Sequence, residues 1–261
     1  MNLSLVGKTA VICGSTQGIG LAIAKELAQL GAACILLARN EDALQKVVQS
    51  LDNSFNQKHT YFVADFSDSA QVKTVVDSIV KTTPIHVLIN NTGGPATGQI
   101  AEATAEAFLQ AFQQHLVNNQ LLVQAVLPSM KKEGYGRIIN IISTSVRIPI
   151  DNLGVSNTIR AAVASWAKTL SNEVGKFNIT VNSVLPGFTK TQRLESLIET
   201  NATKAGIDKT ELAKKMEEAI PMKRFGEVAE IAAVVAFLAS PAASYVNGVS
   251  ITVDGGKTGT I

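Results

Sequence analysis

The 261-residue chain contains few of the residues that mark disulfide-rich or metal-binding proteins. It has two cysteines, three histidines and one tryptophan, and only 17% of its residues are charged. Cys13 and Cys34 both lie in short apolar runs, which predicts buried free thiols rather than a disulfide. No group of histidines, cysteines and carboxylates has the spacing of a metal site, so we expect no bound metal.

The chain also lacks a large excess of charge of either sign and any long apolar run. The formal net charge is +2 without a clustered basic run, which argues against nucleic acid and an anionic membrane surface as partners. No apolar stretch approaches the roughly 20 residues of a membrane span, and the first residues lack the pattern of a secretory leader. We therefore expect a cytoplasmic protein.

Short apolar runs alternate with helical patterns along the whole chain. Seven runs that are apolar on both faces predict buried strands. Their residue ranges are 8–13, 33–38, 60–64, 85–90, 136–142, 179–185 and 249–254. Between them lie helical patterns such as residues 20–31, where Gly31 suits a helix end. This alternation predicts an α/β fold, a single-domain Rossmann-type doubly wound parallel sheet of about seven strands with helices on both faces, spanning residues 1–261.

One polar, helix-prone segment, residues 193–220, interrupts the alternation. It lies between the sequences PGFTKT and PMKRFG. We expect an insertion at about residues 190–220 that forms a mobile lid of two helices.

A glycine-rich loop, CGSTQGIG at residues 13–20, follows the first predicted strand and opens a helix. Gly14, Gly18 and Gly20 allow a tight turn and close approach of the backbone to a pyrophosphate, whose charge the helix N-terminus favours. A glycine triplet alone also fits a plain turn. Its position between the first strand and the first helix favours dinucleotide binding.

The end of the second predicted strand indicates which dinucleotide binds. An acidic residue there would bind a ribose 2′-hydroxyl, whereas an arginine accommodates a 2′-phosphate. The sequence has Ala38 followed by Arg39, with no acid at the strand end. This favours NADP(H) over NAD(H), although a solvated loop position is the alternative for Arg39.

The glycine spacing resembles the T-G-x-x-x-G-x-G loop of the short-chain dehydrogenase/reductase family, with Cys13 in the place of the Thr. Further motifs follow in the family's order: VADF, NNTG, GRIINIIS, PGFTKT and a closing VDGG. The resemblance covers essentially the whole chain and is nearest to 3-oxoacyl-carrier-protein reductases and glucose dehydrogenase-like members. It implies a hydride transfer between a nicotinamide and a carbonyl or alcohol carbon.

The resemblance also implies a set of cofactor contacts. These are Gly14, Ser15, Thr16, Gly18, Ile19, Gly20, Arg39, Asp65, Phe66, Asn91, Thr92, Gly93, Arg160, Pro186, Gly187 and Thr189.

The family's catalytic residues are a Ser, a Tyr, a Lys and an Asn, and only the first is kept. The Ser corresponds to Ser143, but the Tyr position carries Ser156 and the Lys position carries Arg160. The Asn position falls on His115, or on Asn118 or Asn119 if the helix is shifted by a turn.

These replacements change the chemistry. An aliphatic hydroxyl is far less acidic than a phenol, so Ser156 cannot replace the Tyr directly and at best holds a water molecule. Arg160 still supplies a fixed cation and donors to ribose hydroxyls, but it cannot release a proton. His115 is a candidate acid, since an imidazole titrates near neutrality. The favoured alternative is packing, because Phe108, Phe112, His115 and Asn119 share one predicted helix face.

Other residues have weaker functional signals. Arg147 and Asp151 lie in the loop before Ser156, where family members contact substrate, but a solvated loop is equally consistent with them. Trp166 shares an apolar helix face, which favours the core or a subunit interface. His59 and His86 belong to no cluster.

Three classes of function remain at this point. The first is an NADP(H)-dependent oxidoreductase with an atypical proton relay, acting on a small-molecule or acyl-carrier-linked carbonyl. The second is a nucleotide-binding sensor or assembly partner that has lost the chemistry, and the third is a lyase or isomerase that uses the nucleotide structurally. Apolar faces on the predicted helices 108–127 and 155–174, with the family resemblance, predict a homo-oligomer, a tetramer or dimer.

Overall fold

The computed structural model describes residues 1–260 and contains a seven-stranded sheet in which every neighbouring pair is parallel. The strand order is β3-β2-β1-β4-β5-β6-β7. The strands are β1 Thr9–Cys13, β2 Ala33–Ala38, β3 Thr60–Val63, β4 Val87–Asn90, β5 Gly136–Ile141, β6 Ile179–Pro186 and β7 Ser250–Val253. All seven predicted strands are confirmed, with ends displaced by no more than two residues.

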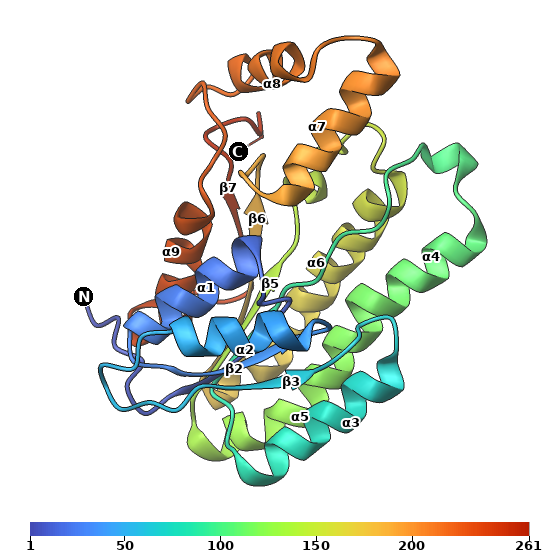
Figure 1. Cartoon of the computed structure of the whole chain (residues 1–261). Helices are drawn as coiled ribbons and strands as arrows, with labels where there is room; N and C mark the ends of the chain where they lie inside the picture. The colour runs from blue at the N-terminus through green and yellow to red at the C-terminus, as the bar shows by residue number, and fades with distance from the viewer. Residues whose placement is uncertain (261) are drawn as a thin grey trace.

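Helices cover both faces of the sheet, as Figure 1 shows. One layer holds α1 (Gly18–Gln29), α2 (Glu41–Ser50) and α9 (Val228–Ala239), and the other holds α3 (Ser69–Thr82), α5 (Asn118–Glu133) and α6 (Gly154–Val174). Strand β1 explains why the sheet needs both layers. Its Ala10 and Ile12 pack into one core cluster and its Val11 and Cys13 into the other, because successive side chains of a strand point to opposite faces.

The chain order creates a crevice at one edge of the sheet. From β1 the chain winds outward through β2 to β3, and then returns to place β4 on the other side of β1. The loops that follow β1 and β4 therefore separate in opposite directions, and the carboxyl ends of these strands border an open crevice. The glycine-rich loop begins at this point, directly after Cys13.

The helical segment before β5 contains a turn that the sequence pattern did not predict. Helix α4 (Ala105–Phe112) continues into a π-helical turn, Gln113–Val117, and then into α5. Phe112, directly before this turn, is 43% exposed, whereas His115, within the turn, is 1% exposed, because the wider turn shifts the side chains after Phe112 around the helix axis. The prediction that Phe112 and His115 share one packed face is therefore wrong.

The expected pair of helices forms the insertion between β6 and α9. They are α7 (Gln192–Ala205) and α8 (Lys209–Glu218), which lie in orange at one end of the sheet in Figure 1. The insertion has an apolar cluster of its own, formed by Leu194, Ile198, Ile220 and Phe225.

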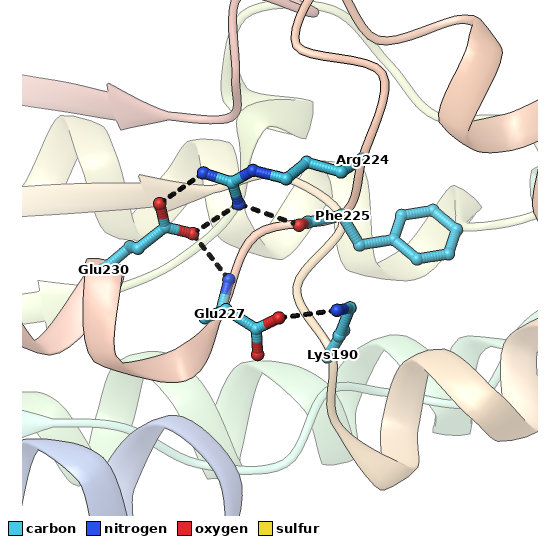
Figure 2. A network of polar contacts seen from close by, with 5 residues as sticks. All are labelled: Lys190, Arg224, Phe225, Glu227 and Glu230. Carbon is cyan, nitrogen blue, oxygen red and sulfur yellow. Dashed lines mark hydrogen bonds and ion pairs between the residues drawn. The ribbon is translucent and has the colours of Figure 1, made fainter.

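Both ends of this insertion are held together at its base. The amide of Lys190 donates to the carbonyl of Gly226 at 2.9 Å, and the amide of Gly226 donates to the carbonyl of Phe188 at 2.9 Å. Figure 2 shows the side chains around this pairing: Lys190 pairs with Glu227, and Arg224 pairs with Glu230. These ion pairs are exposed and contribute little individually, so the backbone pairing is the main connection.

The two cysteines form no disulfide, as the sequence predicted. Cys13 and Cys34 are free and buried, and burial raises the pKa of each thiol to about 12. Within residues 1–260, no helix combines the length and the hydropathy needed to cross a membrane, and no cluster of potential metal ligands is present.

Candidate active site

An open cleft of about 2020 Å³ lies at the carboxyl ends of the strands. This exceeds the volume of roughly 300–1,000 Å³ typical of pockets for small ligands, so the cleft has room for a dinucleotide and a second molecule. Every site residue predicted from the sequence lines it except Ser15 and His115. The lining residues are Gly14, Thr16, Gly18, Ile19, Gly20, Arg39, Asp65, Phe66, Asn91, Thr92, Gly93, Ser143, Ser156, Arg160, Pro186, Gly187 and Thr189.

The glycine-rich loop is packed too closely for side chains. Gly14 has a φ of +60°, and a Cβ atom there would lie 2.4 Å from the carbonyl oxygen of Asn91. A Cβ atom on Gly20 would lie 2.1 Å from the carbonyl oxygen of Gly14. The side-chain amide nitrogen of Asn91, Nδ2, also donates to the carbonyls of Cys13 and Gly14, at 3.2 and 3.1 Å. The loop is thus fixed in a shape that only glycine permits.

The start of α1 is available to an anion. Its N-cap residue, Gln17, makes no side-chain capping bond. The amide groups of the first helical turn have no intrahelical acceptors and point toward the helix N-terminus, where they suit a pyrophosphate. Ser15 is fully buried and does not line the cleft, so the structure does not bring it to the position predicted for a cofactor contact.

The far end of the cleft has the features expected for an adenosine 2′-phosphate site. Arg39 is exposed immediately after β2, without an acidic residue at the strand end. Hydrogen bonds from Ser67, followed by the nearby charge of Arg39, lower the pKa of Asp65, so its carboxylate stays ionised. Asn118 donates to the carbonyl of Phe66 at 2.7 Å and holds this loop in place. Because its side chain is engaged there, Asn118 does not occupy the place expected for the catalytic Asn.

Ser143, Ser156 and Arg160 line the same part of the cleft. Ser143 follows β5, and its hydroxyl oxygen accepts a hydrogen bond from the amide of Ser145 at 3.1 Å, which leaves its proton free to be donated. Ser156 and Arg160 lie one turn apart on α6 and are 7% and 8% exposed. The helix therefore presents a hydroxyl and a guanidinium group to the space beside Ser143.

Arg160 is held by backbone carbonyls. Its Nη1 donates to Ile141 at 3.0 Å and its Nη2 to Thr92 at 3.5 Å. Burial, and then the charge of Arg193, lower the pKa of Arg160 to about 10. At neutral pH the side chain is still a cation.

His115 lies behind the side of the cleft formed by Ser143, Ser156 and Arg160 and does not itself line the cleft. Its Nδ1 is 2.8 Å from the hydroxyl of Thr92, whose carbonyl accepts from Arg160. Burial, and then the charge of Arg160, lower the pKa of His115 to about 3. The imidazole is therefore neutral at physiological pH and supports Thr92. An acid role for His115 stays a prediction that this pKa disfavours.

Two residues of the cleft were missed by sequence reasoning. Thr191 caps α7 and lies against the glycine loop, with its Cγ2 3.4 Å from the position of a Cβ on Gly18. Arg193, in the first turn of α7, donates to the carbonyl of Pro95 at 2.7 Å. Thr191 follows Thr189 by two positions in PGFTKT and could have been considered. Arg193 had no signal, because its contact joins segments that are 98 residues apart.

The other residues singled out in the sequence are either exposed or make contacts that support the fold. Asp151 lines the cleft and Arg147 does not, and both are exposed. Trp166 donates to Gln120 at 2.8 Å and packs against core residues, as expected. His59 and His86 each accept a hydrogen bond from a backbone amide of a strand.

Comparison with known proteins identifies the relatives of this chain. Residues 14–258 match the family model described as enoyl-(acyl carrier protein) reductase. The NADPH-dependent reductase BacG of Bacillus subtilis (strain 168) is 32% identical over 97% of this chain and 99% of its own. The 3-oxoacyl-(acyl-carrier-protein) reductase FabG of Haemophilus influenzae is 36% identical over 96% of this chain and 98% of its own.

A solved structure has the same fold as this chain. The L-sorbose reductase from Gluconobacter frateurii, crystallised with NADPH and L-sorbose, superposes with a TM-score of 0.93. It is 32% identical, and the match covers 100% of both chains.

We expect Gly14→Ala to weaken NADPH binding and to lower the free energy of unfolding by about 1–3 kcal/mol, the usual cost of forcing a side chain into a strained backbone conformation. Fluorescence titration with NADPH and urea unfolding measure the two effects. The matched control is Gly98→Ala, since a Cβ atom on Gly98 meets nothing within 4 Å. Equal behaviour of the two variants would contradict the close packing of the loop.

Proposed function

The chain belongs to the short-chain dehydrogenase/reductase family, and we propose that it is an NADP(H)-dependent oxidoreductase that interconverts a carbonyl and an alcohol. The observation that carries the proposal is the single cleft that joins the glycine-rich loop to Ser143 and Arg160. Such an arrangement brings a dinucleotide and a carbonyl group together beside hydrogen-bond donors.

The choice of NADP(H) rests on the adenosine end of the cleft. Arg39 offers a guanidinium group where a 2′-phosphate would lie, and no carboxylate ends β2. NADPH appears in the names of BacG and of the L-sorbose reductase complex, and both are similar to this chain over nearly its whole length. The preference predicted from Arg39 agrees with these relatives.

The residues of the cleft are suited to stabilising charge on a carbonyl oxygen. The cofactor, when bound, supplies or accepts the hydride. Ser143 has a hydroxyl proton free to donate to the oxygen as negative charge develops, and Arg160 provides a fixed cation on the adjacent wall. Electrostatic stabilisation of this kind does not require a group that releases a proton.

The source of the proton differs from that of typical family members. A tyrosine phenol would extend further into the cleft than the hydroxyl of Ser156, and it would be far more acidic. We propose that Ser156 binds a water molecule, that this water donates a proton to the alkoxide, and that the hydroxide left behind takes a proton from solvent in the cleft. His115 and Thr92 act as positioning residues, because the imidazole contacts the Thr92 hydroxyl and the Thr92 carbonyl accepts a hydrogen bond from Arg160.

The proposal also assigns roles to the insertion and to helix α4. Helices α7 and α8 contribute Leu194, Leu197 and Met216 to the cleft lining and would act as a mobile lid over a bound substrate. The substrate would be a small-molecule or acyl-carrier-linked carbonyl compound, in keeping with the names of the relatives. Leu109 and Phe112, 70% and 43% exposed on α4, would be covered in a homo-oligomer.

A second function remains open on one observation. Ser156 replaces the expected acid, and the lowered pKa of His115 keeps the imidazole neutral, so neither of these two positions supplies a ready proton donor. This favours, as the alternative, a nucleotide-binding sensor or assembly partner.

Ketone-dependent NADPH oxidation distinguishes the two functions. We expect the unaltered protein to be active and Ser143→Ala to be about a hundredfold slower, because one donor to the developing oxyanion is lost. Ser78→Ala, on the exposed side of α3, is the control. If only the double variant Ser156→Tyr with Arg160→Lys oxidised NADPH, the sensor would be the better description.

Arg39→Asp should weaken NADPH binding about tenfold or more, because a charge-assisted contact to phosphate is replaced by repulsion. NADH binding should change little, since NADH lacks the 2′-phosphate. Titration calorimetry with both nucleotides measures the ratio. Lys46→Asp reverses the same charge at an exposed position outside the cleft and should leave the ratio unchanged.

The rate of reduction should not change stepwise near pH 6.5 in a profile from about pH 5 to about pH 8. Across that range His115, with a pKa lowered to about 3, stays neutral, and Arg160, with a pKa of about 10, stays charged. A step near pH 6.5 that disappears in His115→Gln would show instead that the imidazole titrates during turnover.

A further inference from the structure

Two guanidinium groups converge at one point of the cleft. The Nη2 atoms of Arg160 and Arg193 each lie 3.5 Å from the position that a Cβ atom of Gly94 would occupy. Arg160 reaches this point from α6 and Arg193 from the first turn of α7. Because Gly94 has no side chain, the space between the two groups is left open.

Arg160 has no anionic partner in the described part of the chain. Residues 1–260 contain four ion pairs, and none of them involves Arg160. A guanidinium group has five N–H donors, and the two hydrogen bonds recorded for this one are both to neutral backbone carbonyls. A cation that is 8% exposed and faces a second cation is costly to keep without a negative charge nearby.

Arg193 is placed so that it can share such a charge. Its side chain is exposed and belongs to the insertion, and its hydrogen bond to the carbonyl of Pro95 directs it to the loop that carries Gly94. The charge of Arg193 is felt at Arg160, where it opposes protonation. An anion between the two groups would remove this repulsion.

The charged residues that line the cleft are mainly cations. The carboxylates are Glu26, Asp65 and Asp151, and the cations are Lys25, Arg39, Arg160, Lys190, Arg193, Lys215 and Lys257. Lys190 and Lys215 are paired with Glu227 and Glu211. Asp151 forms no ion pair with Arg160 or Arg193 in residues 1–260. An anionic ligand would therefore enter a region of favourable potential.

We infer that the carbonyl substrate carries an oxyanion, a carboxylate or a phosphate ester, which binds between Arg160 and Arg193 at Gly94. This inference rests on the proposed oxidoreductase function and adds the substrate class. The planar guanidinium groups match both kinds of oxyanion, since each offers two parallel donors to two oxygens. Arg193 is then a specificity-determining residue that the insertion brings to the site.

Kinetics with a matched pair of substrates test the inference. The probes are 4-oxopentanoate and its methyl ester, which share the same ketone and differ in the negative charge. We expect the unaltered protein to prefer the acid in kcat/KM by about tenfold or more, as for a hydrogen bond between charged groups. In Arg193→Gln the preference should fall to near unity, whereas NADPH affinity should be retained. Arg147→Gln, which changes an exposed arginine outside the cleft, should retain the preference.

A binding experiment separates failure of this inference from failure of the proposed function. Malonate and inorganic phosphate are titrated by calorimetry into the NADPH-bound protein and into its Arg193→Gln variant. Binding that is lost in the variant supports the oxyanion site even if no ketone is reduced, and the tighter of the two ions identifies the carboxylate or the phosphate.

Two results would overturn the oxyanion site. One is equal use of acid and ester by the unaltered protein, with no binding of either ion. The other is a loss of NADPH affinity in Arg193→Gln with an unchanged preference for the acid, which would assign Arg193 to the cofactor instead.

Discussion

The contact between the glycine-rich loop and Asn91 determines where the rest of the cleft can be. At this point the backbones after β1 and β4 approach so closely that a single added carbon on Gly14 or Gly20 would overlap a carbonyl oxygen. The side-chain amide of Asn91 then donates hydrogen bonds across the gap to the carbonyls of Cys13 and Gly14. The start of α1 and the loop carrying Thr92 are thereby fixed relative to each other, and Thr92 in turn receives both His115 and Arg160. The cofactor end and the reactive end of the cleft thus depend on one close approach of backbone.

The features that follow from local pattern were predictable from the sequence. Strand β2 is a continuous apolar run, because both faces of a parallel sheet are covered, and the ends of all seven strands were located within two residues. The glycine spacing located the tight loop between β1 and α1. The π-helical turn at Gln113–Val117 was not predictable, since it arises from packing of α4 and α5 against different neighbours and leaves no mark on residue periodicity. The position of Arg193 depends on how the insertion folds back over the cleft, so it required the structure.

Replacing a lysine by an arginine on α6 changes what this wall of the cleft can do. A lysine ammonium is a single point of charge that readily exchanges protons, whereas the guanidinium of Arg160 is planar, stays charged and bonds in two directions at once. Here it links β5 through Ile141 to the loop after β4 through Thr92. The residue thus combines a structural connection with a permanent positive charge. The catalysis proposed for this site would rely more on fixed electrostatics than on proton exchange with a side chain.

The backbone pairing at Phe188, Lys190 and Gly226 has a consequence for how the protein can change over evolution. Because the ends of the insertion are already held side by side, the entropy of closing the loop between them grows only slowly with its length. The intervening helices also carry their own apolar cluster, so their folding depends little on the sheet. Segments of different length or sequence can therefore be exchanged at this position while the nucleotide-binding framework is kept. In this way the substrate range can change through the insertion while the part of the chain that binds the cofactor stays the same.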